Sequence, residues 1–161
     1  MIYACRDEAL ATVSATPNAV FDYLDDQASL GSHMEKPSMM MMGGSMRYRF
    51  DEDHGRAKGS VIQMEGNVLG IGLSVEEMVT ERDPPVRKAW ETRGIPRLII
   101  LGGYRMGFEI HPDADGSRLR VFIEYNAPES VFGKVMSFLF ARTYARWCVG
   151  RMAADAASHF R

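Results

Sequence analysis

The spacing of hydrophobic positions changes along the 161-residue chain and divides it into strand-like and helix-like regions. Between residues 45 and 126 apolar side chains recur at every second position. In the segment 46–50, for example, a Met, a Tyr and a Phe alternate with two Arg. A period of two is typical of β-strands with one buried face. From residue 131 onward the period is 3.6, which predicts a long C-terminal helix.

The N-terminal part of the chain predicts one strand and two short helices. Residues 8–15 form a short β-branched stretch that ends at Thr16-Pro17. A threonine is a good N-cap and a proline suits the first helical turn, so we expect a helix to begin there. A second short helical piece ends at Gly31.

Turn signals divide the middle of the chain into further strands. The Asp- and Gly-rich segment 51–55, the segment Asp83-Pro84-Pro85 and the segment 113–116 are typical of tight turns. Short connections of this kind join neighbouring antiparallel strands. We therefore expect strands at 45–50, 59–67, 73–81, 87–93, 98–111 and 118–126, the fifth bent at Gly102-Gly103.

The C-terminal helix of about thirty residues would be roughly 45 Å long and would cross the whole domain. Its cationic side chains, at positions 134, 142, 146 and 151, are expected on the solvent face. The opposite stripe is expected to face the sheet and contains Phe132, Met136, Leu139, Phe140, Thr143, Tyr144, Trp147, Met152, Ala156 and Phe160.

Composition describes one neutral, globular domain that spans residues 1–161. Hydrophobic residues make up 46% of the chain and the net charge is -2, which argues against nucleic acid as a partner. Cys5 and Cys148 match no CxxC or Cys/His metal-ligand spacing, and we expect both to be reduced thiols. No apolar run is long enough to span a membrane, so we expect a cytoplasmic protein. The unusual number is 12 methionines.

Three segments carry a resemblance to a known superfamily: Thr16–Phe21, Val79–Pro85 and Tyr144–Cys148. Together with the order of elements, they make the chain resemble a bacterial branch of the START-like, or SRPBCC, superfamily. This superfamily includes Bet v 1-like and polyketide cyclase/dehydrase-type proteins. The resemblance implies an α+β helix-grip fold, a curled antiparallel sheet of about seven strands wrapped around a long C-terminal helix, with two short helices after strand 1.

A helix-grip fold implies a cavity between the sheet and the last helix. The alternative is a core filled by the same side chains. We favour the cavity because its lining would be apolar and aromatic with a few hydroxyls, the usual make-up of a small-molecule pocket. The expected ligand-binding residues are Met46, Tyr48, Val75, Glu77, Trp90, Tyr104, Met106, Phe108, Ile123, Met136, Phe140 and Tyr144.

The resemblance assigns no catalytic residue and no cofactor, because the superfamily contains both carriers and enzymes. We expect the protein to bind a hydrophobic small molecule or lipid. One alternative is a polyketide cyclase- or dehydratase-like enzyme that uses a pocket Glu and Tyr. Another is a protein-interaction module or homodimer built on the run Met39–Met42 and the hairpin tip 68–71. Whether that run faces the cavity or a partner is left open by the sequence.

Glu77 and Lys88 are the charged residues for which inward-facing positions would matter most. If the strand alternates as predicted, the Glu77 carboxyl shares the inner face with Val75 and Val79 and becomes a candidate acid or base. A register shift of one residue would instead put Glu76 inside or leave Glu77 at a wet rim, and we favour this alternative because glutamates are rarely buried. Lys88 is a candidate to hold a ligand carboxylate or pair with Glu77, although such a lysine more often lies at a rim.

The hydroxyls of Tyr48, Tyr104 and Tyr144 are candidates to polarise a ligand carbonyl in the enzyme alternative. The commoner role of a buried phenol is to satisfy a backbone group. The four histidines have no spacing that suits a metal, and we expect no metal site.

Overall fold

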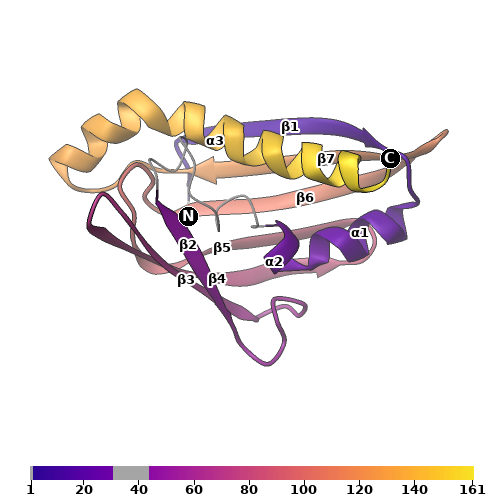
Figure 1. The fold of residues 1–161 in the computed structure, drawn as a ribbon, viewed down its shortest axis with the longest axis horizontal. Coiled ribbons are helices and arrows are strands. Elements are labelled where there is room, and N and C mark those ends of the chain that lie inside the picture. Colours follow the sequence, from indigo (N-terminus) through magenta and orange to yellow (C-terminus); the bar gives the residue numbers. More distant parts are fainter. Residues whose placement is uncertain (1, 31–43) are drawn as a thin grey trace.

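A single β-sheet with helices on one side makes up the part of the protein described by the computed structural model, residues 2–30 and 44–161 (Figure 1). The run Met39–Met42 lies outside the described residues. The helices are α1 (Pro17–Asp25), α2 (Gln27–Leu30) and α3 (Val131–His159). The strands are β1 (Cys5–Val13), β2 (Ser45–Phe50), β3 (Val61–Val68), β4 (Ile71–Asp83), β5 (Arg87–Arg97), β6 (Tyr104–Asp113) and β7 (Gly116–Tyr125).

The sheet is antiparallel, with the seven strands in the order β1-β7-β6-β5-β4-β3-β2. Strands β2 to β7 form a meander of neighbouring pairs, and β1 joins the far edge by pairing along its whole length with β7. Figure 1 shows the curved sheet with α3 running across one side of it. The predicted α+β helix-grip fold is therefore confirmed.

The expected strand at 98–111 is wrong at its start. β5 continues to Arg97, and residues 98–103 are an irregular connection before β6 begins at Tyr104. The backbone N–H of Gly102 donates to the carbonyl of Asn126 at 2.7 Å, which ties the connection to the end of β7. A Cβ on Gly102 would lie 2.6 Å from the Ala127 carbonyl oxygen, so only glycine permits this close approach.

Helix α1 begins where the sequence predicts. The Thr16 side chain accepts a hydrogen bond from the Ala19 N–H, and Pro17 occupies the first turn. The face that α1 buries consists of Val20, Phe21 and Leu24, which join the core.

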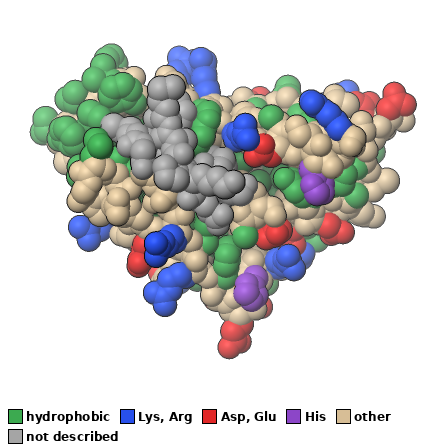
Figure 2. Space-filling model, viewed as in Figure 1, with side chains coloured by type: hydrophobic (Ala, Val, Ile, Leu, Met, Phe, Trp, Pro, Cys, Tyr) green, Lys and Arg blue, Asp and Glu red, His purple; other side chains and the backbone are tan. Residues whose placement is uncertain are grey.

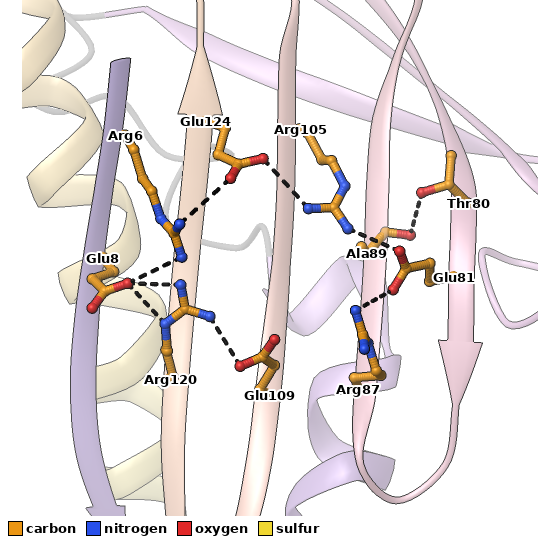
Figure 3. A network of polar contacts seen from close by, with 10 residues as sticks. All are labelled: Arg6, Glu8, Thr80, Glu81, Arg87, Ala89, Arg105, Glu109, Arg120 and Glu124. Atoms are coloured by element: carbon orange, nitrogen blue, oxygen red, sulfur yellow. Dashed lines mark hydrogen bonds and ion pairs between the residues drawn. The ribbon is translucent and has the colours of Figure 1, made fainter. Parts of the chain in front are cut away.

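The outer face of the sheet is polar and held by ion pairs (Figure 3). Arg120 bridges Glu8 at 2.7 Å and Glu109 at 2.9 Å, and so links β1, β7 and β6. Arg105 continues the chain of contacts to Glu81 on β4 at 3.0 Å. Alternation along these strands therefore places charges outside and apolar side chains inside, as predicted for strands with one wet face.

The face that α3 turns toward the sheet differs from the predicted stripe. In its N-terminal half the buried residues are small, at every fourth position: Gly133, Ser137, Ala141 and Ala145. The larger side chains of Phe132, Leu139 and Phe140, expected to face the sheet, are exposed instead. Small residues allow α3 to approach β1 and β7 closely, whereas aromatic side chains on that face would hold the helix away.

The hydrophobic core lies under the helices, and part of it lines a cavity. α3 packs on β1 and β7, and α1 packs on β6 and β7. Beyond α3, strands β2 to β5 curve away, and the side chains there do not fill the space completely. This arrangement leaves a hollow between the inner face of the sheet, α2 and the middle of α3.

Candidate functional site

A largely apolar cavity of about 110 Å³ lies on the inner face of the sheet. Its walls come from α2, from all the strands except β1, and from Tyr144, Cys148 and Met152 on α3, together with the connection 98–101. Its polar exceptions include Glu77 and Gln27. Apolar walls with few polar groups are typical of small-molecule sites.

Strand alternation explains why most of the expected residues meet at the cavity. On β4, Val75 and Glu77 are two positions apart and face inward, and Tyr104 and Met106 do the same on β6. Nine of the twelve expected residues line the cavity: Met46, Tyr48, Val75, Glu77, Trp90, Tyr104, Met106, Ile123 and Tyr144.

Phe108, Met136 and Phe140 do not line the cavity, and the expectation that they do is corrected. Phe108 is fully buried further along β6, where its ring packs edge-on against Phe21 of α1 at 5.5 Å between centroids. Met136 and Phe140 lie in the part of α3 whose small residues face the sheet, so Met136 is only partly buried and Phe140 is 49% exposed.

Glu77 is a carboxyl group inside the cavity wall, with 3% of its surface exposed. Our preference for a wet-rim position is therefore wrong. The Tyr104 hydroxyl donates a hydrogen bond to Glu77 Oε1. Burial raises the pKa of Glu77 to about 7, although the Tyr104 hydrogen bond and the charge of Lys88 pull it down. A carboxyl group with such a pKa exchanges a proton near neutral pH and is suited to acid–base chemistry.

Tyr144 and Cys148 lie one helical turn apart on α3, both line the cavity, and their side chains are hydrogen-bonded. Burial raises the pKa of the Cys148 thiol to about 12 and holds the pKa of Tyr144 well above its usual value. Both groups are neutral at physiological pH. Cys148 is therefore a weak nucleophile, and these two side chains offer hydrogen bonds rather than charge.

Gln27, the first residue of α2, lines the cavity and has a buried hydrogen-bond acceptor without a partner in the described part of the chain. The residue is buried, and its Oε1 atom has no hydrogen-bond partner among residues 2–30 and 44–161. A buried amide oxygen without a partner is costly to keep. A hydroxyl or N–H group on a bound molecule would remove that cost.

Lys88 does not line the cavity. It is 0% exposed, which contradicts the rim position that we considered the commoner one. Its ammonium donates to the Asp25 carboxylate at 2.8 Å and to the Asp25 carbonyl at 3.2 Å. Arg82 contacts the other oxygen of the same carboxylate at 2.8 Å. Asp25 is the last residue of α1, so this cluster anchors the end of that helix to β4 and β5.

Sequence patterns do not identify several of the cavity residues. The sequence predicts a strand at 98–101, and no pattern indicates that its successive residues face one hollow. Gln27 gave no signal, because a lone glutamine in a short helix is ordinary. Cys148 and Met152, however, follow Tyr144 at intervals of four along α3, and that spacing would have identified them.

The described part of the chain has neither a metal-binding cluster nor a membrane-spanning helix. Residues 2–30 and 44–161 contain no group of three His, Cys, Asp or Glu side chains placed to hold a metal ion. None of the helices in the same residues combines the length and apolarity needed to cross a bilayer.

An open, curled sheet packed against a long C-terminal helix, with an apolar hollow between them, defines a helix-grip protein with a candidate ligand site. Comparison with known proteins identifies the family. Residues 7–157 match the family described as "Polyketide cyclase / dehydrase and lipid transport". The chain belongs to this family, within the SRPBCC superfamily.

Solved structures of similar fold come from bacteria and plants. The chain resembles TTHA0849 from Thermus thermophilus (TM-score 0.69, 13% identity, 97% of each chain covered). It also resembles the Zhui aromatase/cyclase from Streptomyces sp. R1128 (TM-score 0.66, 16% identity, 98% of this chain and 96% of that one). A third is the major latex-like protein 151 from Panax ginseng (TM-score 0.60, 10% identity, 98% and 97%). No curated protein matches the sequence. At these identities the likeness concerns the fold.

Proposed function

We propose that this protein is a single ligand-binding domain and that the cavity binds a small, mainly apolar molecule or the apolar end of a lipid. The observation that carries the proposal is the unfilled hollow of about 110 Å³. An engineered protein cavity of about 150 Å³ binds benzene, so a hollow of this size suits a ring or a short chain. Family membership supports the proposal, since the family description includes lipid transport.

The polar groups specify one feature of the ligand. The free acceptor of Gln27 favours a molecule with a hydroxyl or N–H group over its purely hydrocarbon counterpart. Glu77, neutral or charged near pH 7, accepts a second donor when ionised. A neutral molecule with one donor and an apolar body therefore fits better than a charged one.

The test is a pair of probes of nearly equal shape, phenol and toluene, titrated by calorimetry and by thermal shift. Both are expected to raise the melting temperature, because a ligand that binds only the folded state stabilises it. Phenol should bind more tightly than toluene, and the Gln27→Leu variant should lose that difference. The cavity-filling variant Val75→Phe should bind neither probe, whereas the exposed-turn control Val86→Phe should bind both. If neither probe binds the wild-type protein, the proposal is wrong.

A second candidate function is acid–base catalysis on a bound carbonyl compound, which the burial and pKa of Glu77 favour. In this proposal the Glu77 carboxylate removes a proton from the carbon next to the carbonyl, and a tyrosine hydroxyl of the cavity donates to the carbonyl oxygen. The same carboxyl group then returns a proton to that carbon. Removal of this proton is also the first step of an aldol-type cyclisation, in which the enolate carbon then attacks a second carbonyl group. It is likewise the first step of a dehydration, in which a β-hydroxyl group then leaves as water with the proton held by Glu77.

Exchange of that carbon-bound proton in D₂O, followed by NMR with cyclohexanone as the probe, measures this activity. Deuterium incorporation should be faster with wild-type protein than without it, and should rise with pH through about 7 as Glu77 ionises. Glu77→Gln should abolish the acceleration and still bind phenol. The neighbouring Glu76→Gln, at a partly exposed position, should keep it. Equal exchange by wild type and Glu77→Gln leaves binding as the function.

A further inference from the structure

Large hydrophobic side chains are exposed along the N-terminal half of α3. They are Val131, Phe132, Val135, Phe138, Leu139 and Phe140, and Phe138 is 90% exposed. In Figure 2 hydrophobic side chains gather at this end of the molecule, at the left. Scattered exposed apolar residues are ordinary, but a contiguous group of this size marks a surface that contacts something else.

The exposed side chains of α3 are not alone at this end. The turn between β3 and β4 lies at the same end of the long axis in Figure 1, and it exposes Leu69 and Ile71. Ile95, on the part of β5 that pairs with the start of β4, is exposed as well. We call these three residues and the six of α3 the apolar end.

The way in which α3 packs shows that the fold does not use this surface. The small residues Gly133, Ser137 and Ala141 face the sheet, and the aromatic side chains between them face outward. A helix stabilised only by its own domain would have the reverse arrangement, because burying an aromatic side chain contributes more than burying an alanine.

Two exposed cations lie beside the exposed side chains of α3. Residues 131–154 include four basic residues and no Asp or Glu, although Glu129 lies just before the helix. Arg146 pairs with Asp7 at 3.1 Å and Arg151 with Asp155 at 3.2 Å. Lys134 and Arg142 are exposed and have no ion pair among residues 2–30 and 44–161. On the outer face of the sheet, in contrast, cations and carboxylates neutralise each other (Figure 3).

We propose that the apolar end docks on an anionic lipid surface, with the outer side chains of α3 inserted among the acyl chains and Lys134 and Arg142 at the headgroups. Apolar side chains flanked by cations on a surface helix are the features that interfacial binding requires. A second copy of this chain fits less well. Two copies facing each other through this surface would bring four cations together, Lys134 and Arg142 of each copy, and Glu129 is the nearest carboxylate in the sequence of each copy.

The apolar end is continuous with the cavity. Val68 lines the cavity and the next residue, Leu69, is exposed. On α3, Phe140 precedes the lining residue Tyr144 by one turn on the same stripe. A docked molecule would therefore place the apolar hollow next to the acyl chains. The docking itself does not depend on what the cavity binds.

Co-sedimentation with vesicles tests the proposal, using phosphatidylcholine alone and phosphatidylcholine with phosphatidylglycerol. Wild-type protein should bind the anionic vesicles more tightly, and high salt should weaken that binding. The double variant Phe138→Ser, Leu139→Ser should bind at least about tenfold more weakly. Lys134→Gln, Arg142→Gln should lose the preference for anionic vesicles. Because all four side chains are exposed, these variants should melt like wild type.

Matched controls use the same chemistry elsewhere. Leu10→Ser removes an exposed leucine from β1, and Arg56→Gln, Lys58→Gln removes two exposed cations from the β2–β3 connection. Both controls should bind anionic vesicles like wild type. The proposal is overturned if wild type binds no vesicle or if the controls lose as much binding as the α3 variants. It is also overturned if light scattering shows a dimer that Phe138→Ser, Leu139→Ser dissociates, because the surface is then a self-interface.

Discussion

The folded protein favours the neutral form of Glu77, because its carboxyl group is removed from water and, within residues 2–30 and 44–161, is hydrogen-bonded by Tyr104 alone. In the unfolded chain this residue titrates near 4.5, and in the folded protein near 7. Between these values the unfolded chain has released a proton that the folded protein still holds. Stability therefore falls as the pH rises through this window.

We therefore predict that Glu77→Gln removes this pH-dependent loss of stability. The free energy of unfolding of wild type should decrease by up to about 3 kcal/mol relative to the variant between pH 4.5 and pH 7. Urea unfolding of both proteins across this range measures the difference. Glu76→Gln, a change in a partly exposed ion pair with Arg93, should show no such divergence. A wild-type curve parallel to that of Glu77→Gln would contradict the prediction.

Lys88 and Asp25 form a buried pair whose partners are 63 residues apart in sequence. Removing one partner leaves a buried charge with fewer contacts, so Lys88→Met should destabilise the protein by about 3 kcal/mol. In the Lys88→Met background, Asp25→Asn should cost less than in wild type, since the lost partner no longer contributes. Denaturant unfolding of the double-mutant cycle gives both values.

The chain offers a control with the same geometry at the surface. Arg87 is the neighbour of Lys88 on β5 and contacts Glu81 at 2.8 Å, but the side chains of both Arg87 and Glu81 are exposed. Arg87→Met should change the free energy of unfolding by no more than about 1 kcal/mol. Similar costs for Lys88→Met and Arg87→Met would show that burial of the first pair contributes nothing.

These two residues show what local patterns predict and what they do not. Alternation along β4 correctly predicted the inward face of Glu77, but the frequency of buried glutamates argued against it. For Lys88 the alternation gave the face, whereas the partner on α1 that permits complete burial comes from the tertiary fold. A sequence pattern identifies which positions share a face of a strand. Whether a charged side chain at such a position is buried depends on contacts with residues that are distant in sequence, and the pattern contains no information about them.

At the scale of elements, strand positions were more predictable than the orientation of α3. Turns at Asp51–Gly55 and Asp83–Pro85 separate β2 from β3 and β4 from β5, as their composition indicates. The 3.6 period gave the length of α3, but the apolar side chains on two of its faces compete for the sheet. Close approach to β1 and β7 favours the face of α3 with small residues, which we call the small face: Gly133, Ser137, Ala141 and Ala145. A prediction that assumes large residues are buried selects the other face.

The small face predicts a reversal of the usual effect of substitutions. Ala145 is 0% exposed, so Ala145→Leu should force α3 away from the sheet and destabilise the protein by about 1–3 kcal/mol. Phe138→Ser, although it removes an aromatic ring, should change the free energy of unfolding by less than about 0.5 kcal/mol. Thermal unfolding of both variants decides this. A large loss in Phe138→Ser would mean that its ring packs within the fold.

At the scale of the whole molecule, the pairing of β1 with β7 is the feature least accessible to local patterns. The meander from β2 to β7 follows from short turns, whereas β1 pairs with β7 across more than 100 residues. The resemblance to the superfamily implies a curled sheet of about seven strands and does not specify this pair. The pair forms one edge of the sheet, where α3 packs, and the hollow lies beside it.

The cavity and the apolar end adjoin each other, yet they use different side chains on the same elements, such as Val68 inside and Leu69 outside. We therefore predict that they can be disabled separately. Val75→Phe should abolish phenol binding and leave vesicle binding unchanged, because its side chain extends only into the cavity. Phe138→Ser, Leu139→Ser should do the opposite. If filling the cavity also weakened vesicle binding by tenfold or more, the two regions would share a conformational change, and α3 would have to move on the sheet when the protein docks.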